Sequence, residues 1–273
     1  MRLTFTNRNG ILAGQTPTHL YLWPHPALHP YVAHYTLCLG RGVPPPADFP
    51  PLTILPDASG CLVFTLTGDT LDGLLYGPSS RAVRMDNDLG VCPLRFFVEF
   101  RPGGWSAFTR IPLWELTDRI FPLEEGERAL HTLVLDSWRQ TADLDSFVQA
   151  VDRALRARLT DDGRFSGLLA RFLREGGDRQ LLAAETGYSP RHLSRLFRSK
   201  CGLSPKGMEQ ILRINAAARR IQTEESCSLT RLAQDLGYFD QAHFIHAFRE
   251  VCGVTPGVYR AEMSDFYNEP LKF

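Results

Sequence analysis

The C-terminal part of this chain is defined by residues 182–205, which read LAAETGYSPRHLSRLFRSKCGLSP. Residues 232–256, LAQDLGYFDQAHFIHAFREVCGVTP, repeat the same pattern. The copies are 50 residues apart up to the Tyr and 51 apart from Phe197 and Phe248 onward. The second copy therefore carries one extra residue after Tyr238. A period of this length indicates a duplicated structural unit.

Each copy predicts a helix, a tight turn and a second helix. In the first copy, Gly187 can adopt the left-handed conformation that ends a helix. Ser189 followed by Pro190 predicts an N-cap and the first position of the next helix. Along that helix, Leu193 and Phe197 are spaced to face a core. The outward positions are Arg191, Ser194, Arg195 and Arg198. A short turn before an outwardly basic helix is typical of a helix-turn-helix.

The second copy has the same core but a less basic outer side. Gly237 ends its first helix, Asp240 is the predicted N-cap, and Phe244 and Phe248 repeat the core pair. Its outward positions are Gln241, Ala242, Ile245, His246 and Arg249.

The stretch from about residue 166 to residue 263 resembles the DNA-binding domain of AraC/XylS-type transcription regulators. The matching residues are the two copies above, Arg213–Ile221 between them, and residues 253–260. The resemblance implies a DNA-binding domain over 164–273, with helix-turn-helix units at 178–201 and 228–252 joined by a linker helix at 205–222. It implies that two recognition helices enter successive major-groove segments of double-stranded DNA. Contact with RNA polymerase and a role as an activator are expected on the same ground.

The geometry of the linker agrees with that expectation. A helix from Pro205 to about Gln222 is roughly 27 Å long at about 1.5 Å per residue. It can hold two recognition helices near the ~34 Å repeat of B-DNA. Arginine is suited to guanine edges and phosphates. We assign Arg191, Ser194 and Arg195 to base readout, and Arg198 and Lys200 to the DNA backbone. The alternative is that these residues form the solvated face of a helical bundle.

The second unit departs from the family at His246, where members commonly carry Arg. Ala242 and Ile245 cannot donate hydrogen bonds to bases, so readout there falls to Gln241, His246, Arg249 and apolar contact of Ile245 with a thymine methyl. We expect an asymmetric operator, strictly specified under the first unit and loosely under the second. His243 and His246 also raise the hypothesis of a pH switch, against ordinary exposed histidines.

Composition is compatible with a two-domain protein. The chain has 273 residues, 44% hydrophobic content and a formal net charge of zero. Residues 166–273 hold 15 basic and 12 acidic residues, which leaves 15 and 18 for the remainder. Phosphate binding should therefore come from local clusters and be sensitive to salt. No apolar run is long enough to cross a membrane and no signal-type stretch follows Met1, so we expect a cytoplasmic protein.

The cysteines and histidines predict no metal centre and no cofactor. The six cysteines show no zinc-ligand spacing. Cys201 and Cys252, at equivalent repeat positions, are predicted to be small buried residues; redox sensing through Cys38, Cys61 or Cys92 is the alternative. His25 and His29 are four apart, but prolines around them break any helix that would align them. No catalytic motif is present, so we do not expect an enzyme.

The N-terminal part predicts a small antiparallel β-structure. Short apolar runs at 52–55, 61–66, 74–76 and 95–100 are bounded by Pro, Gly, Asp or Ser. A helical segment is expected to begin at about Pro112–Leu116. The pattern resembles the cupin-like N-terminal sensor domain of a subset of the same regulators. The predicted fold is therefore α+β with two domains: a cupin-like antiparallel β-barrel over 1–125 with flanking helices, and an all-α tandem helix-turn-helix domain.

Residues 126–163 predict helices, because apolar residues recur there at helical spacing. In regulators of this architecture such helices lie beside the barrel and often form a dimer contact. The alternative is that they only cover the barrel and lead into the DNA-binding domain.

A small-molecule pocket is expected among the aromatic residues of the N-terminal part. Its predicted lining draws on an aromatic set and a polar group, namely Tyr21, Trp23, Tyr35, Phe64, Tyr76, Phe97, Trp105, and Arg95 or Glu99. The alternative is that these residues form the hydrophobic core.

These observations indicate a sequence-specific DNA-binding transcription regulator that responds to a small molecule through its N-terminal domain. Two alternatives stay open at this stage. One is a ligand-independent regulator whose barrel only dimerises, which a solid core would support. The other is an enzyme or ligand carrier with a vestigial DNA-binding domain.

Overall fold

The N-terminal part of the chain is built on an antiparallel sheet. A computed structural model describes residues 4–39, 52–56, 58–85, 94–161, 163–224 and 227–261. Seven strands pair in the order β1 (Leu12–Gln15), β2 (His19–Leu22), β3 (Val32–Cys38), β8 (Arg95–Phe100), β5 (Cys61–Thr67), β6 (Thr70–Tyr76) and β9 (Ile120–Pro122). A separate ladder joins β4 (Leu52–Ile54) and β7 (Val83–Met85). Within the described residues the strands thus form an open sheet and a short second ladder.

The central strand β8 gives the sheet two different faces. Phe96, Val98 and Phe100 are buried, whereas the alternating Arg95, Phe97 and Glu99 are partly accessible. Side chains alternate across a strand, and residues paired across neighbouring strands share a face. The pairing of β8 with β3 and β5 therefore assigns each residue of those strands to one face. The predicted strand at 95–100 is confirmed.

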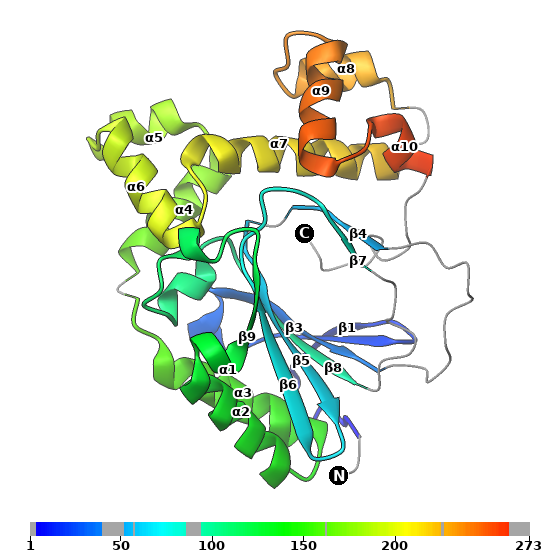
Figure 1. The fold of residues 1–273 in the computed structure, drawn as a ribbon, viewed down its shortest axis with the longest axis vertical. Helices are drawn as coiled ribbons and strands as arrows, with labels where there is room; N and C mark the ends of the chain where they lie inside the picture. Colours follow the sequence, from blue (N-terminus) through cyan, green and yellow to red (C-terminus); the bar gives the residue numbers. More distant parts are fainter. Residues whose placement is uncertain are drawn as a thin grey trace.

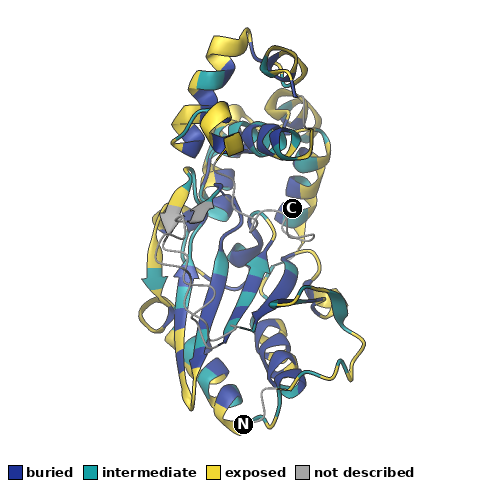
Figure 2. Ribbon diagram, turned by 90° about the vertical axis from the view of Figure 1, so that its right-hand side faces the viewer, coloured by how far each residue is buried: buried dark blue, intermediate teal, exposed yellow. Residues whose placement is uncertain are grey.

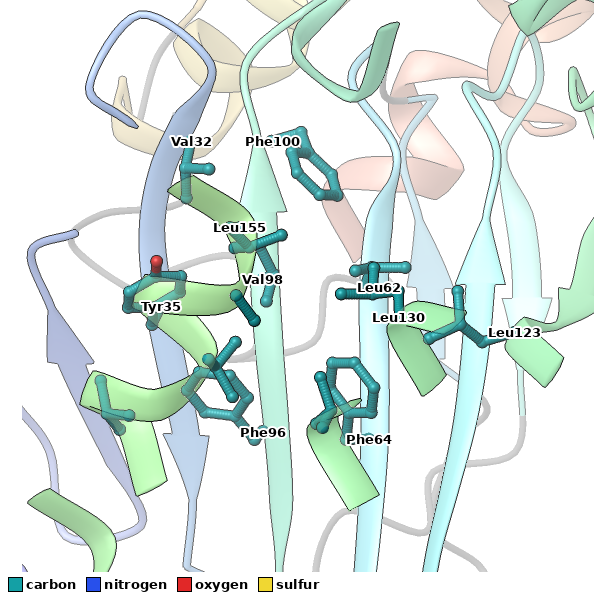
Figure 3. Close-up of a cluster of buried hydrophobic side chains, with 14 of the residues drawn as sticks. Val32, Tyr35, Leu62, Phe64, Phe96, Val98, Phe100, Leu123, Leu130 and Leu155 are labelled. Atoms are coloured by element: carbon teal, nitrogen blue, oxygen red, sulfur yellow. The ribbon is translucent and has the colours of Figure 1, made fainter. Parts of the chain in front are cut away.

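One face of the sheet is covered by two helices, α2 (Arg128–Gln140) and α3 (Leu144–Arg158). Their apolar residues join the same cluster as the sheet, and the rings of Phe96 and Phe147 lie 5.3 Å apart. Figure 3 shows Tyr35, Phe64 and Phe96 together in this layer. Burial of each large side chain contributes roughly 1.5–3 kcal/mol. The apolar stripes of the two helices are thus used inside the chain, to cover the sheet.

The segment between β8 and α2 differs from the prediction of a helix at Pro112–Leu116. The chain turns at Gly103, whose φ is 70°, and forms the short 3-10 helix η2 (Gly104–Ala107). A single 3-10 turn, η3 (Leu113–Glu115), follows. The chain then pairs with β6 as the edge strand β9 and enters the one-turn helix α1 (Leu123–Gly126). A longer helix is excluded because this segment has to reach the sheet edge.

A third 3-10 turn, η1 (Pro26–Leu28), links β2 and β3.

The C-terminal part is helical throughout its described elements. These are α4 (Arg164–Arg174), α5 (Arg179–Thr186), α6 (Pro190–Cys201), α7 (Pro205–Thr223), α8 (Leu229–Asp235), α9 (Gln241–Cys252) and α10 (Pro256–Ala261). The long helix α7 runs between the α4–α6 group and the α8–α10 group (Figure 1). No helix in the described part of the chain has the length and apolar character to span a membrane.

The helix α7 is fixed to both groups through its own buried side. Pro205 takes its first position, as the sequence predicts, and the side chain of Ser204 caps it. Met208 and Ile211 belong to the apolar cluster of the first group. Ile214 and Ile221, further along, belong to the cluster of the second group. Because one helix contributes to both cores, it acts as a rigid spacer between them. Figure 2 shows exposed residues on the outward sides of these helices.

Candidate nucleic-acid interface

The first recognition helix, α6, is oriented by its cap and by a buried aromatic group. The Ser189 side chain accepts a hydrogen bond from the backbone N–H of His192 (3.2 Å), and Gly187 ends the preceding helix with φ 68°. Phe197 is fully buried against Phe172 of α4, with ring centroids 5.0 Å apart. These contacts fix which side of α6 faces outward, and they confirm the predicted caps and core.

The outward side of α6 carries the predicted DNA contacts. Arg191, Arg195 and Arg198 are exposed, and Ser194 and Lys200 are partly exposed. None of the three arginines forms a salt bridge with another residue in the described part of the chain. Their guanidinium groups are therefore free to meet an anionic partner such as a phosphate.

The second recognition helix, α9, repeats this construction with a different outward side. Asp240 accepts from the backbone N–H of His243 (2.7 Å), and Phe244 packs on Phe248 with centroids 5.8 Å apart. Its predicted DNA contacts lie outward: Gln241, His246 and Arg249 are exposed, and Ile245 is partly exposed. The outward face of α9 offers one guanidinium where α6 offers three.

One of these predicted contacts is held by a neighbouring helix. The Thr230 hydroxyl in α8 donates a hydrogen bond to Oε1 of Gln241 (2.7 Å). The amide N–H groups of Gln241 are thus left as donors toward base acceptors. The sequence did not reveal this contact, because Thr230 lies outside the repeated motif.

Phe239 is a residue of this surface that the sequence analysis missed. It lies between Tyr238 and the N-cap Asp240, and its side chain is 90% exposed. The signal that marks it is the single extra residue in the second copy of the repeat.

The N-terminal part contacts the C-terminal ends of both recognition helices. At the end of α6, the Thr117 hydroxyl shares a hydrogen bond between the carbonyl oxygens of Leu113 (3.0 Å) and Gly202 (3.1 Å). In the last turn of α9, the carbonyl of Val251 accepts from the backbone N–H of Ala82 (2.8 Å). Both helices are therefore held at the end away from their outward N-terminal residues.

The segment that follows β4 contacts the linker helix α7 and the apolar clusters of both helix-turn-helix units. Asn215 of α7 donates from Nδ2 to the carbonyl of Pro56 (3.0 Å). Leu55 is buried within the apolar cluster of the second unit, and Ala58 within that of the first. The short segment around Pro56 thus joins the N-terminal part to both helix-turn-helix units at once.

Gly202 shows how close this contact is. Its φ of 77° suits the C-cap of α6, and a Cβ placed there would lie 2.4 Å from Thr117 Oγ1. The repeat-equivalent Gly253 has φ 74° and no atom within 4 Å of the same position. The two glycines share a capping role, and only Gly202 also lies against the N-terminal part.

The cysteines of the repeat are packing residues, as predicted. Cys201 and Cys252 are buried, and burial raises the pKa of the Cys201 thiol and raises that of Cys252 to about 12. Both thiols are therefore protonated at neutral pH and shielded from reagents. Cys38 is also buried and Cys61 is partly accessible, both without a disulfide. Cys92 lies outside the described residues.

Six of the nine residues named for the predicted ligand pocket, namely Tyr35, Phe64, Tyr76, Arg95, Phe97 and Glu99, do not lie on one face of the sheet. Tyr35 pairs with Val98 and Phe64 with Phe96, which places both on the face covered by α2 and α3. The two side chains are fully buried in that core. Arg95, Phe97, Glu99 and Tyr76 lie on the opposite face, as their pairing with Cys38, Thr36, His34 and Cys61 shows. A single pocket made of all six is therefore wrong.

Tyr35 has a structural partner on the helix-covered face. Its hydroxyl donates to Oδ1 of Asp152 (3.0 Å), which also accepts from the backbone N–H of His25 (2.9 Å). Burial, and then the charge of Asp152, raise the pKa of the Tyr35 hydroxyl. Asp152 thus ties β3 and the turn before η1 to helix α3. These residues border a hollow of about 350 Å³ beside α3.

The opposite face of the sheet combines polar and aromatic side chains. His34 pairs with Glu99, and Cys61 pairs with both Glu99 and Tyr76, so these residues form one row across the sheet. His34 is 5% exposed, and its ring lies 5.9 Å from that of Tyr21. Polar groups buried on a sheet face are unusual outside functional or hydrogen-bonded networks. In the described residues, no cluster of three potential metal ligands occurs.

Comparison with known proteins gives family matches for both parts of the chain. Residues 182–262 match the family model described as a helix-turn-helix domain, and residues 21–122 match a domain of unknown function, DUF6597. The HTH-type transcriptional regulator GlxA of Rhizobium meliloti is 36% identical over 83 residues, which are 30% of this chain and 25% of GlxA. The uncharacterized HTH-type regulator YfiF of Bacillus subtilis is 32% identical over 84 residues, 31% of this chain and 26% of YfiF. The chain thus spans about a quarter of the length of these curated relatives.

Solved structures give similar but looser matches. The DNA-binding domain of AdpA in complex with a target DNA covers 38% of this chain, with 95% of its own length matched, 27% identity and a TM-score of 0.32. ToxT from Vibrio cholerae covers 78% of this chain, with 94% of its own length matched, 10% identity and a TM-score of 0.37.

Residues 182–262 form a helix-turn-helix domain, homologous to the corresponding part of HTH-type transcriptional regulators. It is preceded by a separate part built on an antiparallel sheet.

Proposed function

We propose that this protein is a sequence-specific DNA-binding transcription regulator. The observation that carries the proposal is the presentation of two recognition helices by one rigid spacer, with Arg191, Arg195 and Arg198 exposed and without protein partners in the described chain. The match of residues 182–262 to helix-turn-helix domains supports it. Regulators of this class are not typically enzymes, and the proposal assigns no catalytic residue.

The proposed DNA-binding domain comprises residues 164–273, and its contacts divide by role. In the first unit, Arg191, Ser194 and Arg195 read base edges, and Arg198 and Lys200 bind phosphates. The second unit uses Gln241, His246 and Arg249 as polar contacts and Ile245 as an apolar contact. Because the second unit offers one arginine fork where the first offers three, the half-site under the second unit is less strictly specified.

The N-terminal part, over residues 1–125 with the helices of 126–163, is proposed to control operator binding by the two units. Its contacts at Gly202, Val251 and Asn215 hold both recognition helices and the linker. A ligand that favours one arrangement of these contacts must change operator affinity by its differential binding. The proposed consequence in the cell is altered contact with RNA polymerase, in the cytoplasm, with activation as the outcome.

The proposed effector site lies on the sheet face that is not covered by α2 and α3. Glu99, Tyr76 and Arg95 lie on that face together with the aromatic side chain of Phe97. A small polar molecule fits this chemistry.

A ligand-independent regulator, or one whose N-terminal part only forms a homodimer, is the second candidate. It is favoured by the burial of Tyr35 and Phe64, which lie in the hydrophobic core on the helix-covered face. Thermal-shift screening of the intact chain with small polar metabolites separates the two candidates. An effector should raise the Tm, change operator affinity, and lose both effects in Arg95→Ala, Glu99→Ala but not in Trp23→Ala. A metabolite that binds the Arg95→Ala, Glu99→Ala variant as well as it binds the unsubstituted chain would contradict the proposed site.

DNA binding itself is tested by selecting genomic fragments with the intact chain and footprinting them at fixed salt. The test variant is Arg191→Ala, Arg195→Ala. The matched control is Arg128→Ala, Arg153→Ala, which removes the same charge from exposed positions of α2 and α3. Discrete footprints that are lost only in the test variant support the proposal. Diffuse, salt-sensitive binding that is equal in all three proteins contradicts it.

A further inference from the structure

The turn of the second helix-turn-helix unit is built differently from that of the first. In the first unit Tyr188 directly precedes the N-cap Ser189 and is 43% exposed. In the second unit one residue, Phe239, intervenes between Tyr238 and the N-cap Asp240. Tyr238 is only 7% exposed. The insertion has therefore exchanged a half-exposed tyrosine for a buried tyrosine and an exposed phenylalanine.

The buried position that Phe239 would otherwise take is already filled. An apolar residue directly before an N-cap commonly packs on the fourth residue of the helix, which is Phe244 here. In this protein the ring of Tyr238 makes that contact, with centroids 5.4 Å apart, and it also lies 5.3 Å from the ring of His243. Phe239 is left 90% exposed, more than any other large hydrophobic residue in the described chain.

Two apolar residues follow Phe239 at intervals of three along the recognition helix. Ala242 is exposed one turn along, and Ile245 is partly exposed a further turn along. Neither can donate or accept a side-chain hydrogen bond. Oε1 of Gln241, beside them, is engaged by Thr230. The corresponding surface of the first unit carries Arg191, Ser194 and Arg195 instead.

We propose that Phe239 is a specificity-determining residue that reads the 5-methyl groups of thymine in the half-site under the second unit. The proposal rests on the proposed function of DNA binding. Residues at the N-terminal end of a recognition helix meet base edges in the major groove. The thymine methyl is the apolar feature of that groove, and alanine and phenylalanine are suited to contact it. In this proposal, Phe239, Ala242 and Ile245 form one apolar surface that contacts thymine methyl groups.

This inference adds a chemical preference to the looser half-site. A unit with few hydrogen-bond donors still discriminates if its partner surface is apolar, because a methyl group that leaves water gains free energy without any polar pairing. The second half-site should therefore contain thymines at fixed positions, and should tolerate changes at its other positions.

The test begins with an operator selected from random duplexes by the intact chain. Each thymine of the second half-site is then replaced by uracil, which removes only the 5-methyl group and keeps the base pair. Operator affinity is measured for the unsubstituted chain, for Phe239→Ala and Phe239→Leu, and for the control Val258→Ala, an exposed apolar residue in α10. The same replacements in the first half-site provide the control on the DNA side.

For the unsubstituted chain, at least one uracil replacement should weaken binding about threefold to fivefold, the effect expected for one buried methyl group. Phe239→Ala should weaken binding to the thymine operator and should be insensitive to that same replacement. Phe239→Leu should retain part of the sensitivity, and Val258→Ala should behave as the unsubstituted chain.

Two results would overturn the inference while leaving DNA binding intact. One is undiminished operator affinity in Phe239→Ala, and the other is a loss of affinity in that variant with the uracil sensitivity preserved. Failure to select any operator would overturn the proposed function and this inference with it.

Discussion

The outward face of α6 carries three exposed arginines, whereas that of α9 carries one arginine beside an alanine and an isoleucine, and an exposed phenylalanine precedes its N-cap. The parts that fold the two units are nearly the same. Each recognition helix has a side-chain N-cap, buried phenylalanine in its core and a glycine with positive φ at its C-terminal end. The duplication has preserved the parts that fold each unit and has changed the parts that meet the partner. The comparison shows that the residues that fold each unit are different from the residues that face the proposed partner.

The largest expected effect tests whether the two cores are equivalent. Phe197→Ala and Phe248→Ala should each lower the free energy of unfolding by about 3–5 kcal/mol, because both rings are fully buried. Chemical denaturation measures this. A loss below about 1 kcal/mol for either variant would show that its unit does not depend on the aromatic core.

The next effect tests the difference between the recognition faces. Arg191→Ala or Arg195→Ala should weaken operator binding by about 1–3 kcal/mol each. Gln241→Ala should cost less than about 1 kcal/mol, because it removes a neutral contact from a loosely specified half-site. Titration of a labelled operator at fixed salt measures both. A greater loss for Gln241→Ala than for the arginine variants would reverse the proposed asymmetry.

A matched pair of glycines tests the contact with the N-terminal part. Gly253→Ala should cost about 1–2 kcal/mol of stability, because alanine is strained at a positive φ. Gly202→Ala should cost about 1–3 kcal/mol more, because its new Cβ also meets Thr117. Thermal denaturation of the intact chain provides the comparison. Equal losses would mean that the close approach at Gly202 is not maintained in solution.

The smallest effect concerns the caps of the recognition helices. Ser189→Ala and Asp240→Ala should each destabilise the chain by about 0.5–2 kcal/mol, because each removes the acceptor of a backbone N–H. The replacements Ser189→Asp and Asp240→Ser should restore most of the loss. Rescue at one site only would indicate that the other cap has an additional role.

Sequence alone predicts the local features of the C-terminal domain well. Ser189, Pro190, Gly187 and Asp240 occupy the predicted cap positions, and α7 begins at Pro205 as expected. The reason is that caps and turns depend on a few neighbouring residues with strong conformational preferences. The alternating strand Arg95–Phe100 is predicted for a similar reason.

Features that depend on contacts between residues far apart in the chain are harder to predict from the sequence. Strand register assigns Tyr35 and Phe64 to one face and Glu99 to the other, and no local pattern fixes that register. The backbone hydrogen bond from Ala82 to Val251 depends on no side chain, so it leaves no sequence signal. The exposure of Phe239 likewise follows from the packing of Tyr238 on Phe244.

The most direct test of the account is the affinity of the intact chain for an operator substituted base by base in both half-sites. The account predicts losses of about 1–3 kcal/mol at several positions under the first unit, where arginines read the bases. It predicts small losses under the second unit, except at positions occupied by thymine. Equal losses at all positions of the two half-sites would contradict the proposed division of labour between the units.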